Sequence, residues 1–187
     1  MNILLHICCG PCSIYPLAQL RAQGIEVQGY FYNPNIHPYR EFKQRIQSVQ
    51  QLAETTHFEV DIETEYGLTE YLRKVVFHET KRCPLCYAMR LEPVAKKAKE
   101  EGYDAFSTTL LYSKHQDHEC IRKIGTSLSH KYQIDFYYQD FREGWQQGID
   151  QAIEMKLYRQ AYCGCIYSEQ ERYDKKLKKK IQKINLL

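Results

Sequence analysis

The sequence predicts an α/β fold, in which a parallel sheet carries helices on both faces and the C-terminal part is helical. Short runs of β-branched and aromatic residues alternate with longer segments whose apolar residues recur every three or four positions. Strands that alternate with helices in this way form a parallel sheet covered on both faces. The 187 residues suit a single domain, and no internal repeat or low-complexity linker divides them.

Apolar and β-branched runs identify the expected strands. The first run is short and continuous, as in a buried strand, and it ends at Cys8 and Cys9, where Gly10-Pro11 follows. The five expected strands cover residues 2–7, 25–32, 58–62, 105–111 and 134–138.

Capping residues and apolar spacing identify the expected helices. Ser13 can cap the first helix, and Gly24 stops it. Pro84 fits the first turn of the fourth helix, which places Cys83 near a helix N-terminus, and Gly102 ends that helix. The expected helices cover residues 13–23, 41–55, 68–77, 84–101, 116–132 and 145–156, with a further helix from Ser168.

Ligands of parallel sheets bind beyond the carboxyl ends of the strands. Three groups of residues follow strands in this sequence, namely Cys8-Cys9, the loop 33–38 and Tyr112-Ser113. We therefore expect these groups to converge at one edge of the sheet, where the functional site should lie.

Charge is spread unevenly along the chain. Residues 171–187 contain seven basic and two acidic residues, a net charge of +5, which leaves −2 of the total +3 for residues 1–170. Such a segment attracts phosphate backbones, although a solvated helix end has the same composition. We expect one α/β domain over residues 1–170, which holds the site, and a basic tail over residues 171–187.

No apolar run reaches the roughly 18 residues of a membrane span. The N-terminus lacks the basic region and small-residue cleavage pattern of a signal peptide. We therefore expect a cytoplasmic protein with no membrane partner. In a reducing compartment, its eight cysteines are more often metal ligands or redox catalysts than structural disulfides.

Seven of the eight cysteines fall into three tight groups, and only Cys120 stands apart, as a small core residue of a helix. The first two groups are Cys8-Cys9-x-x-Cys12 and Cys83-x-x-Cys86. The second pair shares one helical turn, whose N-terminal position should lower the pKa of both thiols. Alone, this pair suits a redox dithiol, half a zinc site or half an iron–sulfur site.

Together with Cys8 and Cys9, the helical pair supplies four thiolates from two segments, which suits tetrahedral zinc or a four-iron cluster. We expect adjacent cysteine side chains to point apart, which favours an extended cluster over a single ion, and zinc remains the alternative. The third group, Cys163-Gly164-Cys165, is interpreted as a redox-active dithiol, with a metal-binding or structural role as alternatives.

Five motifs in sequence order resemble the cobalamin-independent epoxyqueuosine reductases of the QueH type, over residues 3–173. They are His6-x-Cys8-Cys9-x-Pro11, Tyr32-Asn33-Pro34-Asn35-Ile36-x-Pro38, Cys83-x-x-Cys86 with Arg90, Ser107-Thr108-Thr109-Leu110-Leu111-x-Ser113, and Tyr158-Arg159-Gln160-x-Tyr162-Cys163-Gly164-Cys165. The resemblance implies a Rossmann-like fold of the adenine-nucleotide α-hydrolase type. It also implies reductive removal of the epoxide oxygen of epoxyqueuosine in the anticodon loop of tRNA, the last step of queuosine synthesis.

The same resemblance implies a [4Fe–4S] cluster on Cys8, Cys9, Cys83 and Cys86. Family members are thought to place another metal beside the cluster, so an additional mononuclear iron is expected. Cys12 is its candidate ligand, although some relatives carry an aspartate at this position. Cys163 and Cys165 are expected to be redox-active.

The reduction of an epoxide to an alkene consumes two electrons and two protons and releases water. No side chain supplies low-potential electrons, so a metal cofactor and an external electron donor are expected. A Lewis-acidic iron beside the cluster would polarise the epoxide oxygen. A nearby acid must protonate that oxygen, and the candidates are His6, Asp104, Tyr112 and His115.

Arginines are expected to bind the phosphates of tRNA and tyrosines to stack on its unpaired bases. The candidate substrate-binding residues are Tyr32, Asn33, Asn35, Arg90, Tyr112, Ser113 and Arg159. Two other functions remain open, an ATP-dependent tRNA-modifying enzyme of the same fold and a zinc-stabilised RNA-binding module. Against the first, the turn after the first strand contains one glycine and Pro11, too few backbone N–H donors for a phosphate loop.

Overall fold

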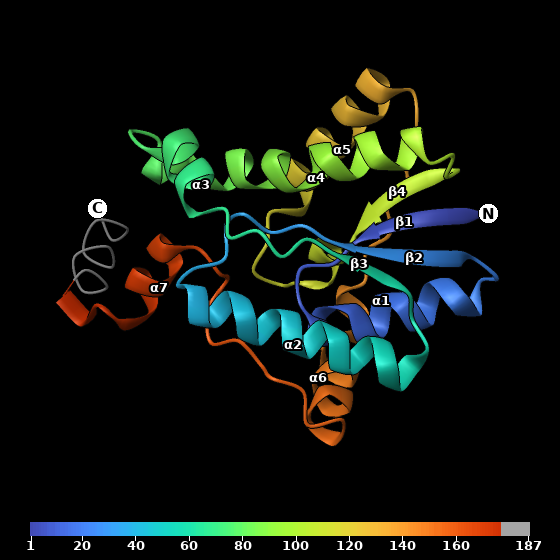
Figure 1. Cartoon of the computed structure of the whole chain (residues 1–187), viewed down its shortest axis with the longest axis horizontal. Coiled ribbons are helices and arrows are strands. Elements are labelled where there is room, and N and C mark those ends of the chain that lie inside the picture. Colours follow the sequence, from blue (N-terminus) through green and yellow to red (C-terminus); the bar gives the residue numbers. More distant parts are fainter. Residues whose placement is uncertain (177–187) are drawn as a thin grey trace.

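The computed structural model describes residues 1–176, and within them five parallel strands form one sheet in the order β3-β2-β1-β4-β5 (Figure 1). The strands are β1 (Asn2–His6), β2 (Glu26–Phe31), β3 (Val60–Ile62), β4 (Ala105–Thr108) and β5 (Asp135–Phe136). β1 lies at the centre and is buried from its second residue onward, as a strand covered on both faces requires. The predicted α/β fold with a parallel sheet is confirmed.

Helices cover both faces of the sheet, with α1, α2 and α6 on one side and α4 and α5 on the other (Figure 1). The α-helices are α1 (Gly10–Ala22), α2 (Tyr39–Thr56), α3 (Leu68–Val75), α4 (Arg82–Glu100), α5 (His118–Tyr132), α6 (Trp145–Glu154) and α7 (Ile166–Tyr173). The short 3₁₀ helices are η1 (Glu79–Lys81), η2 (Thr109–Tyr112) and η3 (Arg142–Gly144). α7 lies beyond the carboxyl ends of the strands (Figure 1).

The core gathers around the central strands. Leu4, Leu5 and Phe106 are fully buried there, and side chains from the helices on both faces join them. None of the described helices combines the length and apolar character needed to cross a bilayer.

The strand expected over residues 105–111 is wrong in its second half. β4 ends at Thr108, because the hydroxyl of that residue accepts a hydrogen bond from the backbone N–H of Leu110 at 3.1 Å and turns the chain into η2. β5 is also shorter than expected. The turn matters for the site, because it leads Tyr112 and Ser113 away from the sheet at its carboxyl edge.

The helical C-terminal part is confirmed by α7, which begins two residues before the expected Ser168. Of the basic tail predicted over residues 171–187, only the first six residues are described. The lysines expected to give most of its charge, Lys178, Lys179, Lys180 and Lys183, lie outside the described residues.

Candidate metal centre and substrate cavity

The turn between β1 and α1 carries three thiols. Cys8 follows β1, Cys9 is the N-cap of α1 in an extended conformation, and Cys12 lies on the first turn of that helix. A glycine is needed between them, because a Cβ at Gly10 would lie 2.6 Å from the backbone oxygen of Ser48 on α2. The sequence Cys-Cys-Gly therefore lets α1 start directly against α2.

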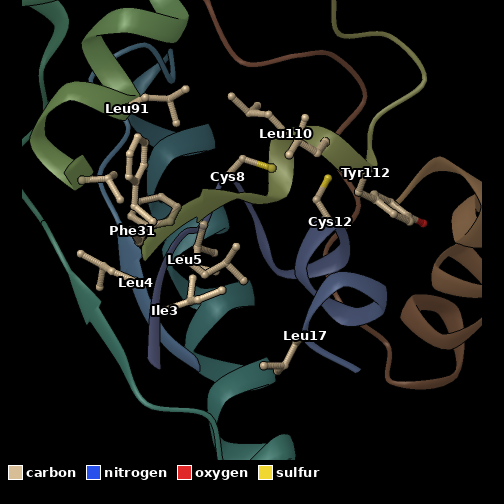
Figure 2. Close-up of a cluster of buried hydrophobic side chains, with 14 of the residues drawn as sticks. Ile3, Leu4, Leu5, Cys8, Cys12, Leu17, Phe31, Leu91, Leu110 and Tyr112 are labelled. Carbon is tan, nitrogen blue, oxygen red and sulfur yellow. The ribbon is translucent and has the colours of Figure 1, made fainter. Parts of the chain in front are cut away.

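The three sulfur atoms converge. The Sγ atoms of Cys8, Cys9 and Cys12 all lie within 4.8 Å of one another, and those of Cys8 and Cys9 are 3.8 Å apart. Figure 2 shows the sulfur atoms of Cys8 and Cys12 close to Leu110. The expectation that adjacent cysteine side chains point apart is wrong here, because the chain turns between them from strand to helix. This buried group can hold a metal ion.

The three thiols differ in acidity. Hydrogen bonds from Cys12 and Cys9 hold the pKa of Cys8 well below its usual range. Burial raises the pKa of Cys9 to about 12, and the hydrogen bond with Cys8 raises the pKa of Cys12. Metal ligation needs thiolates, and the group already favours one at Cys8.

A second group of four thiols forms where the start of α4 faces the segment before α7. Cys83 and Cys86 lie on the first turn of α4, and Cys165 is the N-cap of α7. Cys86 and Cys165 pack in one buried cluster, and the charges of Cys163 and Cys165 add to the rise that burial causes in the pKa of both α4 thiols. All eight cysteines are free thiols.

The prediction that a helix N-terminus lowers the pKa of Cys83 and Cys86 is wrong. Burial raises both pKa values, that of Cys86 to about 12, and outweighs the positive end of α4. Cys165 differs: burial raises its pKa, but hydrogen bonds from Ser168 and Tyr71 overcome this and the net shift is downward. Cys165 thus ionises more readily than a free cysteine, as redox thiols do.

Arg90 links the two thiol groups electrostatically. Its side chain is buried, and its Nε has no hydrogen-bond partner among the described residues. Its positive charge lowers the pKa of Cys8 and partly offsets the rise that burial causes in the pKa of Cys86. A cation in reach of both groups favours the thiolates that metal ligation requires.

A buried ion pair on α2 holds the third cysteine motif in place. Arg45 Nε donates to Glu41 Oε1 at 2.8 Å, and the two side chains are 2% and 6% exposed. The same guanidinium donates to the backbone oxygens of Cys163 at 2.9 Å and Tyr162 at 3.0 Å. The hydroxyl of Tyr158 donates to the other carboxylate oxygen of Glu41. Both ends of the segment 158–163 are therefore fixed to one helix.

Gln160 reaches from this segment to the first thiol group. Its Nε2 donates to the Sγ of Cys9 at 3.0 Å and lies 3.6 Å from that of Cys12, while its Oε1 is buried without a partner among the described residues. Gln116 makes a similar contact, 3.3 Å, with the Sγ of Cys163. Amide donors to sulfur stabilise thiolates and tune the metals that they bind.

A cavity of about 470 Å³ opens between η2, α6 and the segment 158–163. The thiols of Cys8, Cys12 and Cys163 all line it, so it connects the two cysteine groups. Polar and aromatic lining residues include Arg90, Tyr112, Ser113, His115, Trp145 and Arg159. A cavity of this size suits a ligand as large as a nucleoside.

The structure brings four predicted substrate-binding residues to this cavity, Arg90, Tyr112, Ser113 and Arg159, and leaves three outside its lining. Asn33 donates to the backbone oxygen of Ile7 at 2.9 Å and ties the loop after β2 to the end of β1. Asn35 is buried, and neither polar atom of its amide has a partner among the described residues. Tyr32 donates to Glu70 at 3.4 Å.

Two predicted proton donors are badly placed. His6 is fully buried, its Nδ1 is 2.8 Å from the hydroxyl of Thr108, and burial lowers its pKa to about 3. Asp104 precedes β4, at the opposite edge of the sheet from the cysteines, and accepts a hydrogen bond from the backbone of Asn2 at 2.7 Å. His115 and Tyr112 line the cavity.

From the sequence, Arg45 is expected only as one of several arginines that could bind phosphate, Gln160 appears only within a motif, and Trp145 has no assigned role. The Glu41–Arg45 pair carried a weak signal, since its spacing of four residues allows an ion pair on a helix, but burial of that pair depends on a segment far along the chain. Trp145 is the single tryptophan of the sequence, but its place on the cavity wall depends on the packing of α6 against η2 and carried no local signal.

Comparisons with known proteins agree on one family. The family model of epoxyqueuosine reductase QueH matches residues 3–171. A curated "Epoxyqueuosine reductase QueH" of Dehalococcoides mccartyi is 37% identical over 174 residues, 93% of this chain and 96% of the relative. One of Thermotoga maritima is 34% identical over 185 residues, 93% of each chain.

The fold has a counterpart among solved structures. The crystal structure of a predicted subunit of tRNA methyltransferase from Methanocaldococcus jannaschii aligns with a TM-score of 0.56 at 14% identity, over 82% of this chain and 75% of that one. At this identity the likeness concerns the fold alone, and it agrees with the expected Rossmann-like class.

Proposed function

The chain belongs to the epoxyqueuosine reductase QueH family, and we propose that it reduces the epoxide of epoxyqueuosine in tRNA to the alkene of queuosine. The observation that carries the proposal is the cavity that joins the thiols of both cysteine groups to Arg90 and Arg159. Reducing groups and phosphate-binding groups thus face one space. The turn after β1 gives no support to the ATP-dependent alternative, because Pro11 removes a backbone donor from the start of α1.

For the cofactor we propose a [4Fe–4S] cluster on Cys8, Cys9, Cys83 and Cys86, with Cys12 as a ligand of an adjacent iron. Three observations support the donor set: the buried thiols of Cys8, Cys9 and Cys12 converge, a thiolate is favoured at Cys8, and the charge of Arg90 lowers the pKa of Cys8 and acts in the same direction on Cys86. When bound, the cluster would supply single electrons and the adjacent iron would polarise the epoxide oxygen.

Cys163 and Cys165 would store the electron pair that one turnover needs. Oxidation of the two thiols to a disulfide releases two electrons and two protons, and reduction of the epoxide to an alkene and water consumes the same number. An external electron donor then reduces the disulfide. The position of this pair beside Cys83 and Cys86 supports the proposal, as does the lowered pKa of Cys165.

Of the predicted proton donors, we propose His115, which lines the cavity and packs edge-on against Trp145 with ring centroids 5.6 Å apart. An imidazolium at this wall could donate its proton to the oxygen that leaves the ring. Tyr112 is the weaker donor, because its hydroxyl already donates to the backbone oxygen of Trp145 at 2.7 Å.

The remaining proposals concern the surroundings of the reaction. Residues 1–170 form one catalytic domain, and the basic residues of 171–187 add affinity for tRNA without taking part in the chemistry. The protein works in the cytoplasm, where tRNA is present and free thiols stay reduced.

Anaerobic purification followed by iron and sulfide quantification tests the proposal most directly. Iron and sulfide should co-purify with the protein, and Cys83→Ser or Cys86→Ser should remove most of the iron and all turnover of epoxyqueuosine tRNA. Cys120→Ser is the matched control, because this thiol belongs to none of the three groups, and it should retain both. Full iron retention in Cys83→Ser would overturn the ligand assignment, and stoichiometric zinc without iron would favour the RNA-binding module.

The electron-pair role of the third motif needs a separate experiment. The double variant Cys163→Ser/Cys165→Ser should keep its iron but lose multiple-turnover activity. Loss of the iron instead would identify these two residues as metal ligands.

A further inference from the structure

One wall of the cavity is aromatic and belongs to α6. Trp145 is the first residue of that helix, and its ring is stacked with that of Tyr112, with centroids 5.2 Å apart and planes inclined by 27°. The hydroxyl of Tyr112 donates to the backbone oxygen of Trp145 at 2.7 Å. Figure 2 shows Tyr112 pointing from the cysteine group toward this helix. The two rings are thus held together by stacking and by this hydrogen bond.

The packing of α6 supports this arrangement. A Cβ at Gly148 would lie 2.4 Å from the hydroxyl of Tyr112, so the glycine one turn after Trp145 leaves room for the tyrosine. Ile149 follows on the same helix and also lines the cavity. The wall is therefore mainly aromatic and apolar, with Lys114 Nζ 5.8 Å from the centroid of the Trp145 ring and His115 packed edge-on against it.

Cations line the same cavity. Arg90, Arg159 and Arg172 all face it, and the first of them is buried. A ligand that satisfies an aromatic wall and several guanidinium groups at once is planar and carries anionic groups. An unpaired nucleotide of an RNA loop has both features, since bases stack on aromatic side chains and arginines hold phosphates.

We propose that Tyr112, Trp145 and Ile149 form the subsite on which the modified base of the RNA loop stacks. This inference rests on the proposed function, because it takes the substrate base to be carried by tRNA. The wall and the residues Cys8 and Cys12 line one cavity, so a base stacked on Trp145 lies in the same space as the metal-binding group.

The single tryptophan makes the subsite directly observable. Trp145 is the only tryptophan of the chain, so selective tryptophan fluorescence reports on this wall alone. The holoenzyme should be titrated anaerobically with an anticodon stem–loop that carries epoxyqueuosine and with the same hairpin made abasic at that position. The modified hairpin should quench Trp145, and the abasic hairpin should bind without comparable quenching.

Variants give the size of the effect. Trp145→Ala should weaken binding of the modified hairpin about 5-fold to 150-fold, the range that loss of one base–aromatic stack produces, and should leave the abasic hairpin nearly unaffected. Trp145→Phe should retain most of the affinity. Phe77→Ala is the matched control, because this aromatic side chain is 91% exposed and lies outside the cavity lining, and it should change neither affinity.

Arg172→Ala separates phosphate binding from stacking. It should weaken both hairpins by the same factor, because a phosphate contact does not depend on the base. The stacking subsite is refuted if both hairpins quench Trp145 equally, or if Trp145→Phe and Trp145→Ala bind the modified hairpin as the wild type does. If Trp145 reports base-dependent binding but the holoenzyme does not reduce the epoxide, the subsite stands and the proposed function fails.

Discussion

Replacement of Arg45 by methionine should destabilise the protein far more than a typical substitution of an arginine. Met keeps the length and apolar volume of the side chain but removes the charge. The change deletes the buried ion pair with Glu41 and both hydrogen bonds to the backbone of Tyr162 and Cys163. Removal of one partner from a buried ion pair costs about 3–5 kcal/mol, because the other charge stays buried without compensation.

The assay is thermal unfolding of the anaerobic holoenzyme. A loss of about 3–5 kcal/mol in a chain of this length corresponds to a fall in Tm of roughly 6–20 °C. Arg21→Met is the matched control, because Arg21 also donates to two backbone oxygens, those of Thr56 at 2.9 Å and His57 at 3.0 Å, but is exposed. It should lower Tm by less than about 4 °C, as expected for an exposed contact worth no more than about 1 kcal/mol.

The double variant Glu41→Gln/Arg45→Met tests the cause. Without the carboxylate no buried charge is left over, so Tm should recover by several degrees relative to Arg45→Met alone. Alkylation of Cys163 should also become faster in Arg45→Met, because the backbone of that residue loses its anchor. A fall in Tm no larger than that of Arg21→Met would refute the reasoning, as would a double variant less stable than the single one.

Three further predictions follow from other parts of the structure. Gln160→Glu replaces the amide donor at Cys9 with a carboxylate and should lower iron affinity about 10-fold to 100-fold in a chelator competition, whereas the exposed Gln146→Glu should not. Burial lowers the pKa of His37 from 6.5 to about 4, so the stability that this residue contributes is present above pH 6.5 and is lost as the pH falls toward 4. His37→Phe should therefore make the free energy of unfolding less dependent on pH between pH 6.5 and 4. An unchanged pH profile in this variant would contradict the prediction. In a chain that ends at Tyr173, the slope of log binding constant for tRNA against log salt concentration should be shallower by roughly one unit per lost phosphate contact. The single-turnover rate at saturating tRNA should stay the same. An unchanged slope together with an abolished rate would place the tail in the active site.

The fold could be predicted from the sequence because local signals and global architecture agree. The alternation of apolar runs and amphipathic segments identifies each strand of the sheet and each α-helix that covers it. The prediction was wrong for three residues, Thr109, Leu110 and Leu111, which have the composition of a strand but follow a threonine whose side chain accepts a hydrogen bond from the backbone ahead. A single side-chain hydrogen bond there overrides the β-propensity of the run.

The candidate site could be predicted in its chemistry but only partly in its geometry. The position of Cys8 after a buried strand gives its place at the carboxyl edge, because all strands of a parallel sheet point the same way. The burial of Arg45 and the contact of Gln160 with Cys9 depend on how a segment more than a hundred residues later packs on α2. Asp104 shows the opposite case. It precedes β4, so its carboxylate lies at the amino ends of the strands and cannot reach a site at their carboxyl ends.

The first helix also explains why thiols can occupy this position in the fold. Its backbone N–H groups at the N-terminus carry a partial positive charge, a feature that elsewhere binds phosphate. Here Cys9 is the N-cap of α1 and Cys12 lies on the first turn, so the same partial charge faces sulfur. Pro11 removes one N–H group that a phosphate would use, and burial outweighs the remaining field at Cys9, so the thiolate of this group is favoured at Cys8 instead. Thiols that can hold a metal ion are thus accommodated at the start of a helix by side chains alone.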